Sequence, residues 1–476
     1  MQNLTKKTVN STLWSAIERF VTQAIKFALS IVIARMLSPE DYGVVAMVMI
    51  FIAIAETFID SGFSNALIHK QDRSETDFST IFYVNLILGF VAYAILFFSK
   101  GIIADFYNQP ILIDIIPIVG LNIIVSSFRI VQKAKLTISL DFKNQAYIST
   151  ISVLVSGAIA IYLAYLNYGV WVLVLQTLIS NALITILMWV KTKWKPLCTF
   201  STKSFNELFS YGSKLLLAGL MHTVYSNLYT LIIGKKFSTS DLGAFSQGRT
   251  FSYFVPGNVT NVLTNAMFPI LCSIHDDKER TKNAFLKYIR VSCFIFFPCM
   301  ILLSVQAESL IKLLLTDKWI ESILYIQILS IAYMWDPVMR MNANILSIMG
   351  RTDYAFKSEV LKKTLSIAVL ILTLPFGLTV ICLGLAFYVV IDFLVVCFFV
   401  KRVIGVSHID EIKSIFPTLI LSLVMGVVAY YMRDFFELEI LKILVPSLSA
   451  IIIYISVAKA LRFKDFEIIT KELIRR

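Results

Sequence analysis

Residues 34–47 read ARMLSPEDYGVVAM and residues 234–247 read GKKFSTSDLGAFSQ, so a similar polar break occurs twice between long apolar runs. When residues 31–66 are aligned without gaps on residues 231–266, seven of the 36 positions are identical. Several identities fall in the polar break, where a shared hydrophobic composition cannot produce them. These pairs are Ser38 with Ser238, Asp41 with Asp241, and Gly43 with Gly243. The pattern predicts two duplicated halves.

Each polar break also has the chemistry of a helix start. Ser38 in the first copy and Ser240 in the second precede an acidic residue, and a serine oxygen there can accept hydrogen bonds from free backbone N–H groups. The aspartate that follows is stabilised by the positive end of the helix, and the glycine permits close helix approach or unusual backbone angles. Ordinary helix caps explain these local roles but not the common spacing. The residues assigned to the loop and its gating are Asp41, Gly43, Asp241 and Gly243.

The composition indicates a membrane protein. Of the 476 residues, 58% are hydrophobic and 16% are charged, and the mean hydropathy is +0.78. Soluble domains average about 25% charged residues. Apolar segments long enough to cross a bilayer recur along the whole chain, which predicts an all-α polytopic membrane protein with about 14 transmembrane helices. The predicted helices cover residues 10–34, 42–62, 78–98, 111–131, 146–166, 169–190, 209–233, 243–271, 285–305, 322–349, 360–374, 378–400, 414–432 and 441–460.

The net charge of +12 is explained by membrane orientation. With the N-terminus in the cytoplasm, the cytoplasmic loops and both tails carry about 28 Lys and Arg residues and the opposite loops about 8, which fits the positive-inside rule. Both termini are therefore predicted to be cytoplasmic, and no nucleic-acid partner is expected. Glu18, Arg19 and Lys26 inside the first apolar segment argue against a cleavable signal peptide. The six cysteines are scattered and are interpreted as packing residues, so no metal or cofactor is predicted.

The repeat spacing also predicts how the helices are arranged. It places the first predicted helix on the seventh, so both halves keep the same orientation in the membrane. Two parallel six-helix bundles of this kind are pseudo-symmetric about a central cavity, and rocking of the bundles gives alternating access. The predicted divisions are an N-terminal bundle at residues 1–207, a C-terminal bundle at 208–402, and two appended helices with a cytoplasmic tail at 403–476.

The residues from Ala34 to Gly43, the stretch from Asp336 to Gly350 and the two-times-six arrangement resemble the polysaccharide-translocating branch of the multidrug/oligosaccharidyl-lipid/polysaccharide exporter superfamily. The resemblance implies a flippase of the bacterial inner membrane. It would move undecaprenyl-diphosphate-linked oligosaccharide repeat units to the periplasmic leaflet for O-antigen, capsule or exopolysaccharide synthesis. The partners implied are the lipid-linked oligosaccharide, membrane lipids, a polysaccharide polymerase and a chain-length regulator.

The related lipid II flippases use a basic group in helix 1, an acid in the first loop and an arginine in helix 8. Arg19, Asp41 and Arg249 match these positions. Those flippases also use an arginine in helix 2, where this chain has Glu56 and Asp60 instead. This departure argues against lipid II as the cargo.

Cations inside the predicted helices are candidates for substrate contact, because an ionisable group in hydrocarbon costs several kcal/mol unless it faces a cavity or a partner. Arg19 and Lys26 share one face of the first helix. Lys214 and Arg249 enter the seventh and eighth helices, which are their counterparts. Arginine and lysine bind diphosphate oxygens, and amides on the polar eighth helix suit sugar hydroxyls. Internal ion pairs and snorkelling are the alternatives. The predicted substrate-binding residues are Arg19, Lys26, Lys214, Arg249, Gln247 and Asn258.

Several acids are candidates for ion coupling. Asp336 and Arg340 are spaced to pair, and Pro337 between them predicts a kink. Asp392 stands alone near the middle of its helix, where a carboxylate should be protonated or have a partner. The coupling candidates are Glu56, Asp336 and Asp392.

Other charged residues are given structural interpretations. Arg129 and Arg290 lie at cytoplasmic helix ends, where topology and snorkelling are the favoured interpretation and substrate binding is the alternative. His222 is interpreted as a packed, hydrogen-bonded histidine, with a proton relay as the alternative.

Two other classes of protein compete with a flippase. A cation-coupled exporter of small cationic drugs would need an acidic cavity, whereas cations dominate helices 1, 7 and 8. A membrane enzyme would need a large extramembrane loop with catalytic acids or a metal site, and the connections here are short. The sequence is therefore predicted not to be an enzyme. Without a nucleotide-binding motif, its energy would come from an ion gradient, the membrane potential or product removal.

Overall fold

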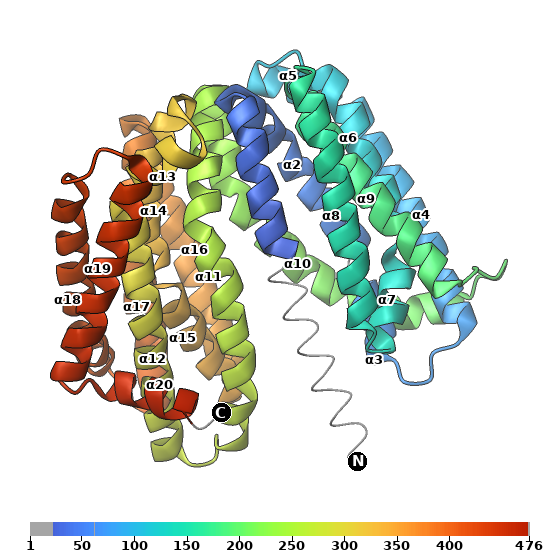
Figure 1. Ribbon diagram of the computed structural model, residues 1–476. Helices are drawn as coiled ribbons and strands as arrows, with labels where there is room; N and C mark the ends of the chain where they lie inside the picture. Colours follow the sequence, from blue (N-terminus) through green and yellow to red (C-terminus); the bar gives the residue numbers. More distant parts are fainter. Residues whose placement is uncertain (1–21, 61, 475–476) are drawn as a thin grey trace. The chain divides into compact units, whose positions relative to one another are not determined.

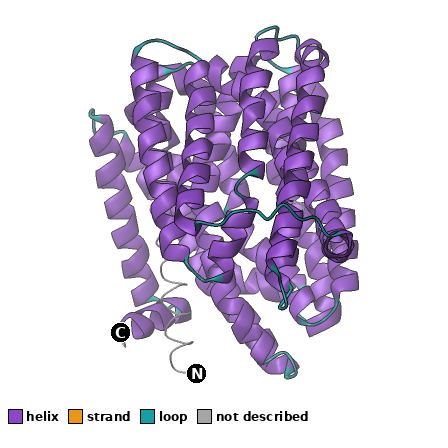
Figure 2. Cartoon of the chain, turned by 90° about the vertical axis from the view of Figure 1, so that its right-hand side faces the viewer, coloured by secondary structure: helices purple, strands orange, loops and turns teal. Residues whose placement is uncertain are grey.

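The computed structural model describes residues 22–60 and 62–474, and within these ranges the chain forms helices and loops without a strand (Figures 1 and 2). Residues 22–36 are helical. The other elements are α2 (Pro39–Asp60), α3 (Phe63–His69), α4 (Glu75–Phe98), α5 (Lys100–Tyr107), α6 (Leu112–Ser127), α7 (Ile130–Ile138), α8 (Phe142–Tyr165), α9 (Trp171–Thr192), α10 (Thr202–Lys236), α11 (Thr239–Ser273), α12 (Lys278–Val305), α13 (Ala307–Leu314), η1 (Asp317–Trp319), α14 (Ile320–Tyr333), α15 (Asp336–Ile348), α16 (Thr352–Thr373), η2 (Leu374–Phe376), α17 (Leu378–Ile404), α18 (His408–Arg433), α19 (Glu439–Ala460) and α20 (Lys464–Ile474).

The helices match the predicted spans closely. Eleven helical stretches of the described chain are long and apolar enough to cross a membrane. The other three predicted spans correspond to residues 22–36, α11 and α16. The prediction of an all-α polytopic membrane protein is confirmed.

The chain forms two compact units, Met1–Ser246 and Gln247–Arg476. Unit 1 contains the helices up to α10 and the first turns of α11, and unit 2 contains the rest of α11 and the helices from α12 to α20. The predicted bundle boundaries at residues 207 and 402 mark the ends of the duplicated halves and not of compact units. They stay a prediction.

Each unit has a core of packed side chains. In unit 1, Phe82 stands edge-on to the ring of Trp194 at a centroid distance of 5.6 Å. In unit 2, a larger cluster joins α12, α15 and α17 and includes the buried Cys293 and Cys397. Because lipid tails are as apolar as these side chains, close packing contributes more to their association than removal of apolar surface from solvent. No group of His, Cys, Asp and Glu side chains in the described ranges could hold a metal ion.

The fourth predicted span of each half is broken into two helices. In unit 1 the break lies between α6 and α7, and in unit 2 it lies between α14 and α15. Pro337 is in the first turn of α15, so the predicted kink is confirmed. A short helix precedes each broken span, α5 in one unit and α13 in the other. This shared local architecture supports the duplication over more of the chain than the aligned polar breaks cover.

Candidate functional site

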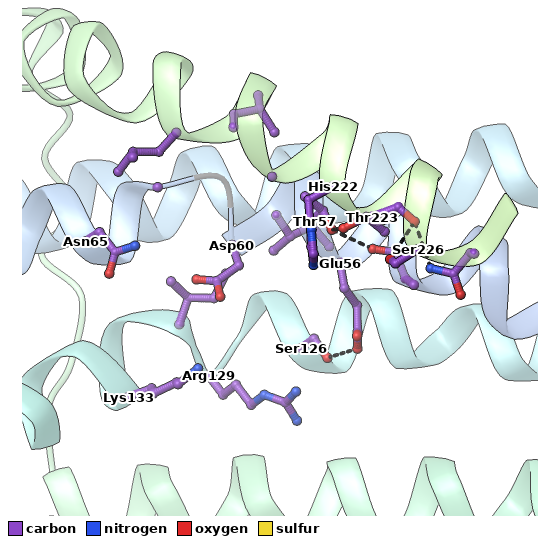
Figure 3. A pocket seen from close by; sticks show the side chains of 18 residues that line it. Glu56, Thr57, Asp60, Asn65, Ser126, Arg129, Lys133, His222, Thr223 and Ser226 are labelled. Atoms are coloured by element: carbon purple, nitrogen blue, oxygen red, sulfur yellow. Dashed lines mark hydrogen bonds between the residues drawn. The ribbon is translucent and has the colours of Figure 1, made fainter. Parts of the chain in front are cut away.

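A polar cavity of about 670 Å³ lies within unit 1, among α2, α3, α6, α7 and α10. Figure 3 shows acidic and hydroxyl side chains of α2 facing polar side chains of α10 and α6 across this space. Its polar lining residues are Glu56, Thr57, Asp60, Asn65, Ser126, Arg129, Lys133, His222, Thr223, Ser226 and Asn227. The cavity therefore offers carboxylates, cations, amides and hydroxyls together inside a membrane-spanning protein.

The helix break places Arg129 at this cavity. Residues Phe128 and Arg129 separate α6 from α7, so backbone carbonyls at the end of α6 lose their partners in the helix. Side chains of α9 satisfy them: Trp189 Nε1 donates to the Phe128 carbonyl at 2.9 Å, and Thr185 Oγ1 donates to the Val125 carbonyl at 3.2 Å. Irregular backbone inside a membrane span is tolerated where other parts of the protein cover it or where it lines a polar cavity.

A chain of amides orients the Arg129 guanidinium. Arg129 Nη1 donates to Asn181 Oδ1 at 2.7 Å, and Asn181 Nδ2 donates to Asn122 Oδ1 at 2.8 Å. Among the described residues, no acid lies within ion-pair distance of Arg129, although Glu56 and Asp60 line the same cavity. Neutral amides therefore hold the guanidinium, and Glu56 and Asp60 act on its charge without forming an ion pair with it.

The acids and hydroxyls of the cavity are also fixed by hydrogen bonds. Ser126 Oγ donates to Glu56 Oε1 at 3.1 Å, which links α6 to α2 (Figure 3). The hydroxyls of Thr57 and Thr223 lie 2.9 Å apart and link α2 to α10. Such groups accept and donate hydrogen bonds at fixed positions, as recognition of sugar hydroxyls requires.

None of the predicted substrate-binding residues whose side chains the structure describes lines this cavity. Arg19 lies outside the described residues. Lys26 is on the helical segment 22–36, is exposed and is not one of the lining residues. The side chain of Lys214 is not described, although its neighbours Leu215 and Leu216 on α10 line the cavity. Their role in binding stays a prediction.

The other three predicted binding residues are on the part of α11 that belongs to unit 2. Gln247 is buried, with 3% of its surface exposed. Arg249 is half-buried beside Tyr333. Asn258 Nδ2 donates to the Phe254 carbonyl of its own helix at 2.7 Å. The positions of these three side chains do not test whether they contact the substrate, so that contact stays a prediction.

Three cations and titratable residues of the cavity are not among the predicted binding residues. Arg129, for which topology is the favoured interpretation, and His222, for which packing is, both line the cavity, and so does Lys133 one turn beyond Arg129. The break that places Arg129 there contains neither Pro nor Gly, the residues that most often interrupt a helix. The available signal was the polar run of Ser126, Ser127 and Arg129 inside an apolar span.

The acids predicted for ion coupling divide between the two units. Glu56 lines the cavity of unit 1, whereas Asp336 and Asp392 line a smaller pocket of about 200 Å³ in unit 2. Arg340 Nε donates to Asp336 Oδ2 at 2.8 Å, which confirms the predicted pair. Arg340 also donates to the hydroxyl of Tyr253 at 2.6 Å.

Asp392 has a partner that the sequence did not identify. Lys362 Nζ lies 3.2 Å from Asp392 Oδ1 and 2.6 Å from Glu359 Oε1. The lysine is on α16 and only 7% of its surface is exposed. A carboxylate alone on its helix is thus paired across the interface of α16 and α17, as the cost of an unpaired buried charge requires.

The duplicated polar breaks form matching caps, with one correction. Asp41 Oδ2 accepts from Ser38 N and Ser38 Oγ, both at 3.0 Å. In the second copy Asp241 Oδ2 accepts from Ser238 N at 3.2 Å and Ser238 Oγ at 2.7 Å. The capping serine is therefore Ser238, and the assignment of Ser240 was wrong, because the aspartate reaches back three residues to close the box.

The two glycines after these caps touch the opposite copy. A Cβ atom on Gly43 would collide with the carbonyl of Thr239, and one on Gly243 would collide with the carbonyl of Pro39. Thr239 and Pro39 occupy equivalent places in the two copies. The starts of α2 and α11 therefore cross in a reciprocal contact within unit 1, as expected for related surfaces that meet about a two-fold axis.

The fold is known from a solved membrane transporter. The chain superposes on the lipid II flippase MurJ in its inward closed conformation with a TM-score of 0.72, covering 95% of this chain and 99% of that chain at 16% sequence identity. The protein is thus a polytopic membrane protein with the fold of this flippase.

The sequence identifies the family. A family model described as polysaccharide biosynthesis protein matches residues 32–324, and the chain belongs to this family. It is 25% identical to the lipopolysaccharide biosynthesis protein WzxC of Escherichia coli over 437 residues, which are 90% of this chain and 89% of that protein. It is 23% identical to the teichuronic acid biosynthesis protein TuaB of Bacillus subtilis over 439 residues, which are 90% of each chain. The family resemblance predicted from the sequence is confirmed.

Proposed function

We propose that this protein is a flippase that moves undecaprenyl-diphosphate-linked oligosaccharide repeat units from the cytoplasmic to the periplasmic leaflet of a bacterial inner membrane. Membership of the polysaccharide biosynthesis family and the fold shared with a lipid II flippase support this class of cargo. The proposed orientation has both termini in the cytoplasm, as the distribution of Lys and Arg predicts. A polymerase and a chain-length regulator are the proposed downstream partners.

The observation that carries the proposal is the cavity of unit 1. Its volume of about 670 Å³ is in the range of ligand-binding pockets. Arg129 and Lys133 provide positive charge for a diphosphate, and Arg129 can bind its oxygens bidentately. Glu56, Asp60 and Asn65 provide acceptors and donors for sugar hydroxyls. The proposed role of the protein is transport, without chemical change of the cargo.

The second candidate, a cation-coupled drug exporter, is favoured by one observation. Glu56 and Asp60 in the same cavity could bind a cationic drug. The amide-held Arg129 would oppose such a cargo, since it adds a buried positive charge close by. A flippase whose cargo joins anionic phosphates to neutral sugars uses both kinds of residue, cations for the phosphates and carboxylates as acceptors for sugar hydroxyls.

The test is deletion of the gene in a strain that displays a capsule or O-antigen, followed by complementation. We expect the deletion to abolish surface polysaccharide and to accumulate lipid-linked repeat units accessible only from the cytoplasmic side. The full chain should restore surface polysaccharide. Normal polysaccharide in the deletion strain, or restored drug resistance as the only phenotype of complementation, would overturn the proposal.

A further inference from the structure

A second polar site lies in unit 2, where the ends of three helices meet. It is a groove of about 360 Å³ lined by residues of α12 and α18, by Phe463 between α19 and α20, and by the first turn of α20. Its charged lining residues are Arg290, Lys413, Lys464 and Asp465, and Ser414 and Thr418 add hydroxyls. Three cations face one acid, so the groove has a net positive charge.

The groove lies where membrane spans begin and end. Arg290 directly precedes the apolar run at residues 291–305 of α12, and Lys413 precedes the apolar run of α18. Lys464 follows the end of α19 by a few residues. All three helices therefore change from polar to apolar at the groove, which is the level at which phospholipid phosphates lie.

The charges of the groove are arranged to accept an anion. Arg290 Nε donates to Asp465 Oδ1 at 3.2 Å, which fixes the guanidinium through one edge and leaves its Nη groups for a second acceptor. Lys413 and Lys464 are exposed, and neither forms an ion pair with a residue in the described part of the chain. Two exposed ammonium groups and a braced guanidinium match the oxygens of a phosphodiester.

The surface beside the groove suits acyl chains. Lys413, Phe416 and Ile420 share one face of α18 because they are three, four and seven residues apart. Phe416 is 54% exposed and Ile420 is 44% exposed, so an apolar strip runs from the groove along the span. A free phosphate ion would contact only the groove. A lipid with a phosphate headgroup would contact the groove with its phosphate and the apolar strip with its acyl chains.

The helix α20 forms one wall of the groove through Lys464 and Asp465. It packs on α12 and α19 (Figure 1), with Phe466 against the cluster around Phe294 and Tyr454. Asp465 and Lys464 in its first turn are thereby held at the rim of the groove.

We propose that this groove binds the phosphate headgroup of an anionic membrane phospholipid, such as phosphatidylglycerol, whose acyl chains lie along α18. The site shares no residue with the cavity of unit 1, and the proposal does not depend on the proposed function. Its physical basis is electrostatic attraction of about 1 kcal/mol for each basic residue near the headgroup, which corresponds to about fivefold in affinity.

The test uses the full-length protein in neutral detergent, with thermal stability and native mass spectrometry as readouts. Phosphatidylglycerol, phosphatidylethanolamine and inorganic phosphate are added separately at equal concentrations. We expect phosphatidylglycerol alone to stabilise the protein and to remain bound in the gas phase. Stabilisation by inorganic phosphate to the same extent would identify a simple anion site and overturn the proposal, and so would equal stabilisation by phosphatidylethanolamine.

Variants locate the site. Lys413→Gln and Lys464→Gln are each expected to weaken phosphatidylglycerol binding about fivefold. The matched control is Lys318→Gln, which removes one exposed lysine outside the groove. Binding that falls equally in all three variants would show a general charge effect, and unchanged binding in the groove variants would exclude this groove. Both lysines are exposed, so the variants are expected to fold.

Discussion

Gly43 in the first turns of α2 packs directly against the backbone carbonyl of Thr239 at the start of α11. The equivalent pair, Gly243 with Pro39, makes the same contact in reverse. One short motif, duplicated in the sequence, thus builds a crossing of two helices in which each copy supplies both the glycine and the surface that the glycine contacts.

Substitution of either glycine should disrupt this crossing. Gly43→Ala and Gly243→Ala each place a methyl group against backbone, which cannot move aside as a side chain could, so we expect a loss of about 1–3 kcal/mol in stability. The effects should be similar in size and less than additive in the double variant, because both act on one contact. Transport should fall with each. Gly101→Ala is the control, since nothing lies within 4 Å of its added Cβ. Full additivity would contradict a shared contact.

The second cap distinguishes two neighbouring serines. Ser238→Ala removes the hydroxyl that bonds Asp241 and should cost about 0.5–2 kcal/mol in stability. Ser240→Ala should be close to neutral by comparison. Thermal unfolding of the two purified variants in the same detergent measures the difference. Equal losses of stability in the two variants would show that both serines contribute to the cap.

Arg129 should be needed for transport more than for folding. Arg129→Gln removes the cation that the cavity offers to a diphosphate, while its amide can still bond Asn181, so we expect surface polysaccharide to fall more than tenfold with normal protein levels. Arg129→Lys should retain partial activity, because a lysine keeps the charge and loses the bidentate geometry. Lys195→Gln, an exposed cation in the loop after α9, is the matched control. Unimpaired transport by Arg129→Gln would remove the central support for the headgroup site.

The pair of Lys362 and Asp392 can be tested by a double-mutant cycle. Lys362→Met leaves the buried Asp392 carboxylate without its partner, and such a loss costs about 3–5 kcal/mol. Asp392→Asn should cost less, because Lys362 keeps its ion pair with Glu359 at 2.6 Å. The double variant should recover most of the stability. If the recovered double variant also transports normally, the pair is structural and Asp392 has no part in ion coupling. If it is stable and inactive, the coupling prediction gains support.

A surface cluster between α13 and α18 should give a defined dependence on pH. Glu308 lies 2.7 Å from Lys312 and 3.3 Å from Arg433, and its hydrogen bond to Lys312 lowers the pKa of the Glu308 carboxyl below its usual 4.5. Since the folded pKa is the lower one, the stabilisation is present above the unfolded pKa and is lost as the pH falls through the folded pKa. Glu308→Gln should therefore lower stability by about 0.5–1 kcal/mol near pH 7, with the difference vanishing under acidic conditions. A difference that persists at pH 3 would show that charge is not its source.

The class of protein, the positions of its spans and the duplication follow from the sequence by itself. They depend on apolar run length, on the bias of Lys and Arg between loops and on helix-start chemistry, all of which are local in the chain. The pair of Asp336 and Arg340 was predictable for the same reason, because both residues are on one helix and four positions apart.

Only the tertiary structure decided which polar residues meet. The cavity joins Glu56 of α2, Arg129 from the break between α6 and α7, and His222 of α10. The partner of Asp392 is on the preceding helix α16. A break without proline or glycine brings Arg129 to the cavity because side chains of α9 satisfy the freed carbonyls of α6. Periodicity along one helix shows which residues share a face, but contacts between helices depend on packing that no single helix encodes.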